Sequence, residues 1–229
     1  VAKSGSNHLA RIHGVWGLGQ IMRQTQKLEK SDVTSLHKTI LTLLSDDDTE
    51  IRAQTCRTLS DSYRPIRLPG FHVRSLDVEQ AGTHISTDQL SEFSFVHLSR
   101  QDGRLIRLLK DDSLRVRSFA AMALRPKIFP QLALKPLLQM LDKNTTGDPV
   151  VRHAAAVALA RIPESTLVSE GLPGAGLSAR MGIVLALRRQ KSKELSRLLD
   201  DPERAIALEA ARAIHDEEIV AALPQLAAL

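Results

Sequence analysis

Two segments of the chain share the same order of apolar and polar positions. Residues 43–52 and 108–117 both read Leu-Leu, one residue, Asp-Asp, three residues, a β-branched residue and Arg, and a Leu follows seven residues after each Arg. Apolar residues three and four positions apart lie on one face of a helix, whereas consecutive Asp residues favour a turn and a helix start. The pattern therefore predicts a pair of helices joined by a tight turn, and it predicts that the pair is repeated.

The step from an anchor position to an aliphatic residue seven positions later recurs along the whole chain. Its six anchors are Arg11, Arg52, Arg117, Arg152, Arg180 and Ala207. Four positions after the anchors lie the small or β-branched residues Val15, Cys56, Ala121, Ala156, Val184 and Ala211. Small side chains allow neighbouring helices to approach closely. Each copy is therefore expected to bury its apolar stripe against the next copy, because one helix pair alone cannot bury it.

Capping residues predict where the second helix of each pair begins. Asp148-Pro149 and Asp201-Pro202 both have the order of an N-cap followed by Pro in the first helical turn. In two other copies the cap is either Asp47 or Asp48, and either Asp112 or Ser113. A shorter apolar first helix is expected before these caps, over residues 36–44, 105–109, 132–141 and 195–199.

The anchor arginines lie near the start of the predicted second helices, where the helix dipole disfavours a cation. A nearby carboxylate would offset this cost. The turn residues Asp47, Asp112 and Asp148 are placed to supply it, across to the adjacent copy. We therefore expect a structural ladder, and not a catalytic Asp–Arg pair, formed by these acids and by Arg52, Arg117, Arg152 and Arg180.

The repeated pattern resembles the HEAT repeat, and the spacings of 28 and 27 residues between the last three anchors resemble the short subtype first recognised in bilin lyases. The resemblance covers nearly the whole chain except about residues 60–100. It implies an all-α fold, a right-handed α-solenoid of the HEAT/armadillo type, as a single domain over residues 1–229.

Four stretches resemble more specifically the HEAT block of certain large bacterial multidomain proteins: residues 8–19, 151–154, 184–189 and 208–214. In that family the block lies between a dehydrogenase-like propeller and a C-terminal cytochrome c domain. The resemblance implies a periplasmic or extracellular protein in which the block holds redox domains in position. The family's Cys-x-x-Cys-His haem motif is absent, since Cys56 is the only cysteine. No cofactor is therefore expected in this chain.

The chain departs from a regular array in its middle and at its ends. The 65 residues between anchors 52 and 117 are about one repeat too many, which predicts an irregular insertion over 62–100. This insertion is either a degenerate repeat or a long loop. The chain opens on a second-helix pattern and closes, at residues 222–229, on a first-helix pattern. We therefore expect a fragment of a longer protein.

The net charge of +5 is unevenly distributed along the sequence. Residues 100–197 contain 18 Lys and Arg against 8 Asp and Glu, and residues 200–229 contain 2 against 7. Two basic runs form a candidate interaction surface: Arg104, Arg107 and Arg115, and Arg188, Arg189, Lys191 and Lys193. On one concave face they could bind a phosphate backbone, as in HEAT-like DNA glycosylases. Ordinary solvated helix surface is the favoured alternative, because aromatic residues for base stacking make up only 3% of the chain.

No residue set has the spacing of a catalytic or metal site. The eight histidines fall in different copies. Cys56 lies in the small-residue column and should be a buried, inert thiol, and Trp16 should pack against or cover the upstream edge of the first copy. No apolar run approaches about 18–20 residues, so membrane insertion is not expected. The sequence thus predicts a non-catalytic scaffold that binds protein, either adjacent domains or another chain, with nucleic-acid binding as the alternative.

Overall fold

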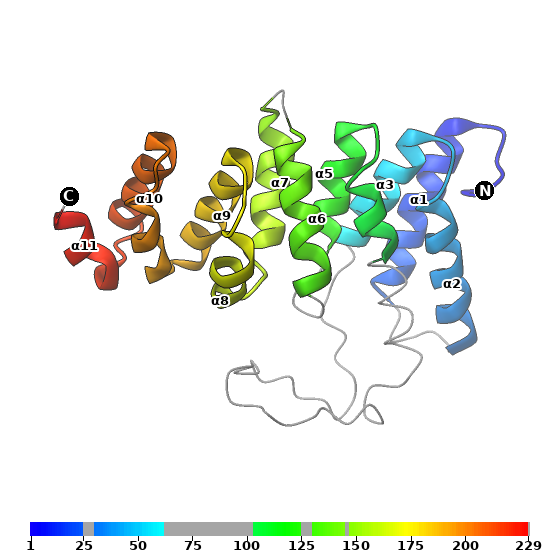
Figure 1. Ribbon diagram of the computed structural model, residues 1–229. Coiled ribbons are helices and arrows are strands. Elements are labelled where there is room, and N and C mark those ends of the chain that lie inside the picture. The colour runs from blue at the N-terminus through cyan, green and yellow to red at the C-terminus, as the bar shows by residue number, and fades with distance from the viewer. Residues whose placement is uncertain (25–29, 62–102, 125–129, 145–146, 229) are drawn as a thin grey trace.

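The computed structural model describes residues 1–24, 30–61, 103–124, 130–144 and 147–228. Helices are the only regular structure in these ranges, which confirms the all-α prediction for them (Figure 1). The α-helices are α1 (His8–Met22), α2 (Lys30–Leu43), α3 (Thr49–Asp61), α5 (Leu114–Ala123), α6 (Pro130–Asp142), α7 (Pro149–Leu159), α8 (Glu164–Thr166), α9 (Leu177–Gln190), α10 (Arg204–Asp216) and α11 (Leu223–Ala227). A further helical stretch covers 103–108. The predicted insertion over 62–100 lies outside the described residues.

The predicted second helices form one continuous row. α1 packs on α3, α3 on α5, α5 on α7, α7 on α9 and α9 on α10, so that chain order is also spatial order (Figure 1). In each of these six helices the anchor is the fourth residue. A row of helix pairs with its termini at opposite ends fits a helical repeat fold.

The first helices form a second layer, which is short in the last two units. α2 packs on α3, and α6 packs on α7 and α9. Between the anchors 152 and 180 this layer consists of α8 and a π-helical turn, η2 (Leu167–Gly171), and before the last anchor it is a 3-10 turn, η3 (Lys193–Leu198). The spacings of 28 and 27 residues leave room for only one or two turns beside a full second helix, which explains the shortening.

The two aliphatic columns lie in the core between neighbouring helices. Val15, Cys56, Ala121, Ala156 and Val184 are buried, while Ala211, in the last copy, is only partly buried. Seven positions after the anchors, the buried residues are Leu59, Leu124, Leu159, Leu187 and Ile214. Alanine and valine at the contact let the helix axes approach, and the larger Leu or Ile fills the space one turn further on.

The N-cap position lies four residues before the anchor, and in four of the six helices its side chain caps the helix. The side chains of Asn7, Asp48, Ser113 and Asp148 accept amide hydrogen bonds from the first turn of α1, α3, α5 and α7. The prediction for Asp148-Pro149 is confirmed, and the alternatives resolve to Asp48 and Ser113. The prediction for Asp201-Pro202 is wrong, because α10 begins at Arg204 with Glu203 as its N-cap.

Candidate functional site

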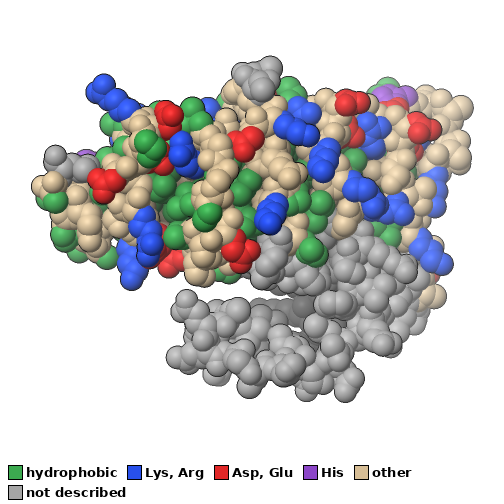
Figure 2. All heavy atoms as spheres, in the orientation of Figure 1, with side chains coloured by type: hydrophobic (Ala, Val, Ile, Leu, Met, Phe, Trp, Pro, Cys, Tyr) green, Lys and Arg blue, Asp and Glu red, His purple; other side chains and the backbone are tan. Residues whose placement is uncertain are grey.

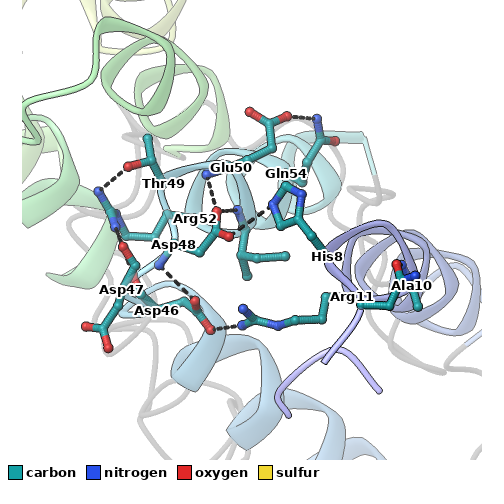
Figure 3. A network of polar contacts seen from close by, with 12 residues as sticks. His8, Ala10, Arg11, Asp46, Asp47, Asp48, Thr49, Glu50, Arg52 and Gln54 are labelled. Carbon is teal, nitrogen blue, oxygen red and sulfur yellow. Dashed lines mark hydrogen bonds and ion pairs between the residues drawn. The ribbon is translucent and has the colours of Figure 1, made fainter. Parts of the chain in front are cut away.

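The strongest polar contact between successive units joins α3 to the turn before α5. Arg52 forms a two-point contact with Asp111, with Nε 2.9 Å from Oδ2 and Nη2 3.2 Å from Oδ1. Its Nη1 also donates to the backbone oxygens of Asp46 and Asp47, at 2.8 and 2.9 Å. The guanidinium therefore binds its own turn, which Figure 3 shows, and the turn of the next unit at the same time.

An anchor arginine also pairs with a turn acid at two other junctions, where the Arg180 contact is an ion pair without a hydrogen bond. Arg11 Nη2 lies 2.5 Å from Asp46 Oδ2 (Figure 3), and Arg180 Nε lies 3.6 Å from Asp201 Oδ2. In all three pairs the acid lies six positions before the next anchor. Its Oδ1 also accepts the amide hydrogen of the residue two positions later, at 2.9–3.0 Å. This turn orients the carboxylate toward the preceding helix.

The register of the predicted ladder therefore needs correction. The acids that pair with anchor arginines are Asp46, Asp111 and Asp201, and not Asp47, Asp112 and Asp148. Asp148 is an N-cap, Asp112 is exposed, and Asp47 contributes its backbone oxygen. The reason is that the residue six positions before the next anchor bends back in the turn, whereas the residues that follow it point to solvent or to the new helix.

Two anchor arginines, Arg117 and Arg152, have no carboxylate partner among the described residues. Arg117 donates through Nη1 to the backbone oxygen of Asp111, in its own turn, at 2.9 Å. Arg152 is exposed, and Gly174 occupies the position six before the next anchor. The middle of the row is therefore joined by other contacts.

These other contacts lie at the C-terminal ends of the second helices. Arg161, after α7, donates to the backbone oxygens of Met122 and Leu124 at the end of α5. Gln190, at the end of α9, donates to the oxygens of Ala160 and Ile162 after α7. Carbonyl oxygens at a helix end have no partner inside the helix, so these side chains stabilise one helix while binding it to the next. Sequence reasoning missed this second ladder, because a lone Arg or Gln at or just after the end of a helix has no repeated signature.

Arg188 forms the densest ion-pair cluster among the described residues, and it joins α9 to α10. Its guanidinium nitrogens lie 3.2 Å from Glu209, 3.1 Å from Asp216 and 3.3 Å from Glu217. Burial lowers the pKa of Arg188, but the hydrogen bonds that it donates to Glu217 and Glu209 outweigh this and raise the pKa above its ordinary value. Arg188 thus remains charged and bound to acids, and it is not available to a ligand.

Five of the other six predicted surface cations fall into two groups. Arg115 lies 3.2 Å from Glu50 and over the Phe119 ring, and Lys191 lies 3.5 Å from Glu217. Arg107, Arg189 and Lys193 are exposed. The seven residues are divided among the helical stretch 103–108, α5 and the region of α9 and η3. Since three of them pair with acids, they do not form one uninterrupted basic strip.

A basic pocket of about 690 Å³ lies at the N-terminal end of the row. Its described lining residues include four cations and no acid: Lys3, Lys38, Arg104 and Arg107. In the view of Figure 2, Lys and Arg side chains gather on the part of the molecule that contains α2 and α3. The sequence indicated Arg104 and Arg107, but Lys3 and Lys38 are distant in sequence and only the fold brings them to the same pocket.

A second groove, of about 460 Å³, lies over α7 and α9. Arg152, His153 and Arg189 provide exposed polar groups, and the partly buried Leu185 provides apolar surface. Glu217 and Arg188, which pair with one another, close it toward α10. The groove thus combines cations, an imidazole and aliphatic surface on the row of second helices.

Cys56 and Trp16 were each assigned an environment from the sequence. Cys56 is fully buried, and burial raises the pKa of its thiol above the ordinary value. Trp16 is 47% exposed, stacks on His13 and donates from Nε1 to Gln54 Oε1 at 2.8 Å. The expectation for Trp16 is wrong, because its indole reaches downstream to α3.

Neither a metal-binding group nor a membrane span is found in the part of the chain that the structure describes. No three His, Cys, Asp or Glu side chains there are placed to hold an ion. None of the helices described is both long and apolar enough to cross a bilayer.

No family model and no curated protein matches the chain. Among solved structures, one engineered protein aligns at 17% identity with a TM-score of 0.46, over 98% of this chain and 93% of its own. A second engineered protein aligns at 16% identity with a TM-score of 0.30, over 98% of this chain and 70% of its own.

Proposed function

We propose that this chain is a non-catalytic scaffold: a row of helix pairs that holds partner proteins, or neighbouring domains of the same protein, at fixed positions. The observation that supports it is the bonding of successive units at both ends of their second helices. Arg52–Asp111 joins the helix starts, and Arg161 and Gln190 join the helix ends. Directional contacts at two points, together with aliphatic packing between them, fix both the distance and the rotation of each unit relative to the next.

We further propose that the repeats belong to the HEAT class, in its short form, and that they form a right-handed superhelix. The constant capping position four residues before each anchor, and the Arg–Asp contact that recurs between units, support this class. A bacterial, redox-type parent protein in the periplasm or outside the cell rests on the resemblance of the four stretches named above.

The groove over α7 and α9 is the protein-binding surface in this proposal. It offers Arg152 and Arg189, exposed cations without an acidic partner among the described residues, beside the partly buried Leu185. Interfaces between proteins combine aliphatic contact with polar groups at the rim, and arginine is enriched in them. This combination suits a polypeptide better than a small metabolite.

A distance measurement tests the scaffold. Nitroxide labels are attached at Gln20→Cys in α1 and Arg212→Cys in α10, both exposed positions. Cys56 is fully buried and stays unlabelled. Five helix-to-helix steps of about 8–10 Å place the labels about 40–50 Å apart. We expect one narrow distance distribution by pulsed electron paramagnetic resonance. A broad or multiple distance distribution in the doubly labelled chain, with no other substitution, would contradict the proposal.

Two matched variants connect this distance to the ladder. Asp111→Ala removes the partly buried partner of Arg52 and should broaden the distribution. Arg115→Ala removes an exposed pair between the same two helices and should leave the distribution unchanged, because exposed ion pairs contribute little.

Binding to a phosphate backbone is the second candidate function, favoured by the basic pocket of Lys3, Lys38, Arg104 and Arg107. Anisotropy of a labelled duplex across a salt series tests it. Phosphate binding requires an affinity that falls steeply with salt, with a log–log slope of about −0.9 for each phosphate neutralised. Absence of saturable binding at physiological salt would rule this candidate out.

A further inference from the structure

The basic pocket at the N-terminal end is built by two helices and the segment before α1. Lys38, Leu41 and Thr42 come from consecutive turns of α2, and Gly103, Arg104 and Arg107 come from the helical stretch 103–108. Lys3 closes the pocket from the N-terminal segment. Residues three and four apart share a helix face, so each helix presents a single face to the pocket.

Arg104 fixes the two helices relative to one another. Its Nη1 donates to the backbone oxygen of Leu41 and to Ser45 Oγ, at 2.9 Å from the latter. The carbonyls at the end of α2 carry partial negative charge, and a guanidinium there is favourable. Arg104 is therefore a positioning residue for the pocket, while Lys3, Lys38 and Arg107 are exposed side chains that remain available to a ligand.

The charge of the pocket selects an anion with several charges. Among its described lining residues no acid offsets the four cations. Like charges gathered in a recess repel one another and concentrate counter-ions. At about 690 Å³ the pocket has the volume of sites for ligands of many atoms, and a single inorganic phosphate would leave most of it open.

A carboxylate-rich peptide fits the lining better than a nucleic acid does. No aromatic residue is among the described lining residues, so bases would have no stacking surface there. Beyond the pocket, Arg11, Arg115 and Arg188 are bound to acids and offer no track for a long phosphate backbone. Leu41 and Thr42 provide contact for the methylene groups of Glu side chains, while Lys and Arg bind their carboxylates.

We propose that the pocket formed by Lys3, Lys38, Arg104 and Arg107 binds an acidic peptide segment, rich in Glu and Asp, of a protein held by this scaffold. The inference rests on the proposed scaffold function and specifies one class of partner for it. Recognition is electrostatic with aliphatic support, so affinity depends on the pocket cations and falls as salt is added.

Binding of a fluorescein-labelled octaglutamate to the whole chain tests the proposal, with octaglutamine as the neutral probe. Lys38→Glu/Arg107→Glu reverses two exposed pocket charges without touching the hydrogen bonds of Arg104. Lys135→Glu/Arg212→Glu makes the same change in net charge at exposed positions away from the pocket. We expect saturable binding of octaglutamate, weakened at least about tenfold by the pocket variant and less than about threefold by the control variant.

Circular dichroism of both variants verifies folding, and Lys38→Gln/Arg107→Gln is the milder substitute if charge reversal prevents it. Equal losses in the pocket and control variants would overturn the proposal, as would equal binding of octaglutamine. Stronger binding of an eight-nucleotide single strand, or full competition by inorganic phosphate at equal charge, would assign the pocket to phosphate ligands. A narrow distribution of distances between the two labels, without peptide binding, would reject the peptide-binding proposal alone. A broad distribution would reject the scaffold proposal.

Discussion

At the scale of single residues, Asp48 shows how one carboxylate starts a repeat. Its Oδ1 accepts the amide hydrogens of Glu50 and Ile51 at 2.8 and 3.2 Å, and Oδ2 lies 3.0 Å from His8 Nε2 of the preceding unit (Figure 3). Burial raises the pKa of Asp48, but the two amide hydrogen bonds and His8 outweigh it and lower the pKa below 3.8. The ionised cap is therefore the stabilising form.

Replacement of this cap should reduce stability by a modest and predictable amount. Asp48→Ala should lower the free energy of unfolding by about 1 kcal/mol at pH 7, as for other N-caps, whereas Asp48→Asn should retain most of it because Asn also caps well. Urea unfolding followed by circular dichroism measures both. Equal losses for Ala and Asn would show that charge, and not capping, supplies the stability.

The pH dependence of the same cap has a defined sign. The folded-state pKa of Asp48 lies below the ordinary 3.8, so its charge contributes stability that is fully present above that value. The contribution is lost as the pH falls through the lower, folded-state pKa. The stability difference between the native chain and Asp48→Asn should therefore shift against the native chain as the pH falls below about 4. A constant difference down to pH 2 would contradict this.

At the scale of elements, two ion pairs connect the same helices, α3 and α5, in different environments. The side chains of Arg52 and Asp111 are 17% and 8% exposed, and those of Arg115 and Glu50 are 52% and 32% exposed. The hydrogen bond and charge of Asp111 raise the pKa of Arg52, against the effect of burial. Both pairs join an arginine to a carboxylate, so a difference in their contributions to stability would report on burial and geometry and not on charge alone.

Double-mutant cycles with alanine should distinguish these pairs. We expect a coupling energy of about 2 kcal/mol for Arg52–Asp111, because its two-point geometry is shielded from water. For Arg115–Glu50 we expect about 0.5 kcal/mol or less, and that coupling should disappear in high salt. Equal coupling energies would show that burial does not determine the strength of these ion pairs.

Two glycines inside second helices should respond to alanine with opposite signs. A Cβ at Gly182 of α9 would overlap Leu141 Cδ1, in a fully packed core, whereas a Cβ at Gly17 of α1 would meet nothing within 4 Å. Gly17→Ala should stabilise by about 0.5–1 kcal/mol through helix propensity. Gly182→Ala should destabilise by about 1 kcal/mol, since overpacking exceeds that gain. Urea unfolding tests both, and stabilisation by Gly182→Ala would show that α6 can shift.

At the scale of the whole molecule, contacts connect each unit mainly to its neighbours. In such a row stability is a sum of unit terms and nearest-neighbour interface terms, so a local loss is not shared equally by all units. Cys56 reports on α3, because it is fully buried and burial raises the pKa of its thiol. Its labelling therefore requires opening of the N-terminal half.

A substitution at the other end should affect this probe only weakly. Asp201→Ala removes the partner of Arg180 in α9, and the junctions with α5 and α7 lie between α9 and α3. We expect the urea midpoint measured by circular dichroism to fall more than the midpoint measured by thiol labelling of Cys56. Asp111→Ala, next to α3, is the matched positive control and should lower both midpoints. Equal shifts of both midpoints in Asp201→Ala would show that the chain unfolds as one unit.

The sequence by itself determined the helical class, the six anchors and the buried columns. These depend on periodicity within one helix and on capping in one turn, as at Asp148, and local spacing encodes both. It also indicated that anchor arginines would meet turn acids. The sequence could not predict that Asp111, and not Asp112, pairs with Arg52, because the direction of a carboxylate in a turn depends on the helix packed beside it.

Only the tertiary structure decided which distant side chains meet. Arg161 reaches α5 across more than thirty residues, and Lys3, Lys38 and Arg107 gather at one pocket from three segments. It also decided that Arg188 is bound by three acids, although its sequence neighbours suggested an open basic patch. The physical reason is that a charge's role depends on what lies within about 4 Å of it, and in a stacked row those neighbours come from the adjacent unit and not from the adjacent residue.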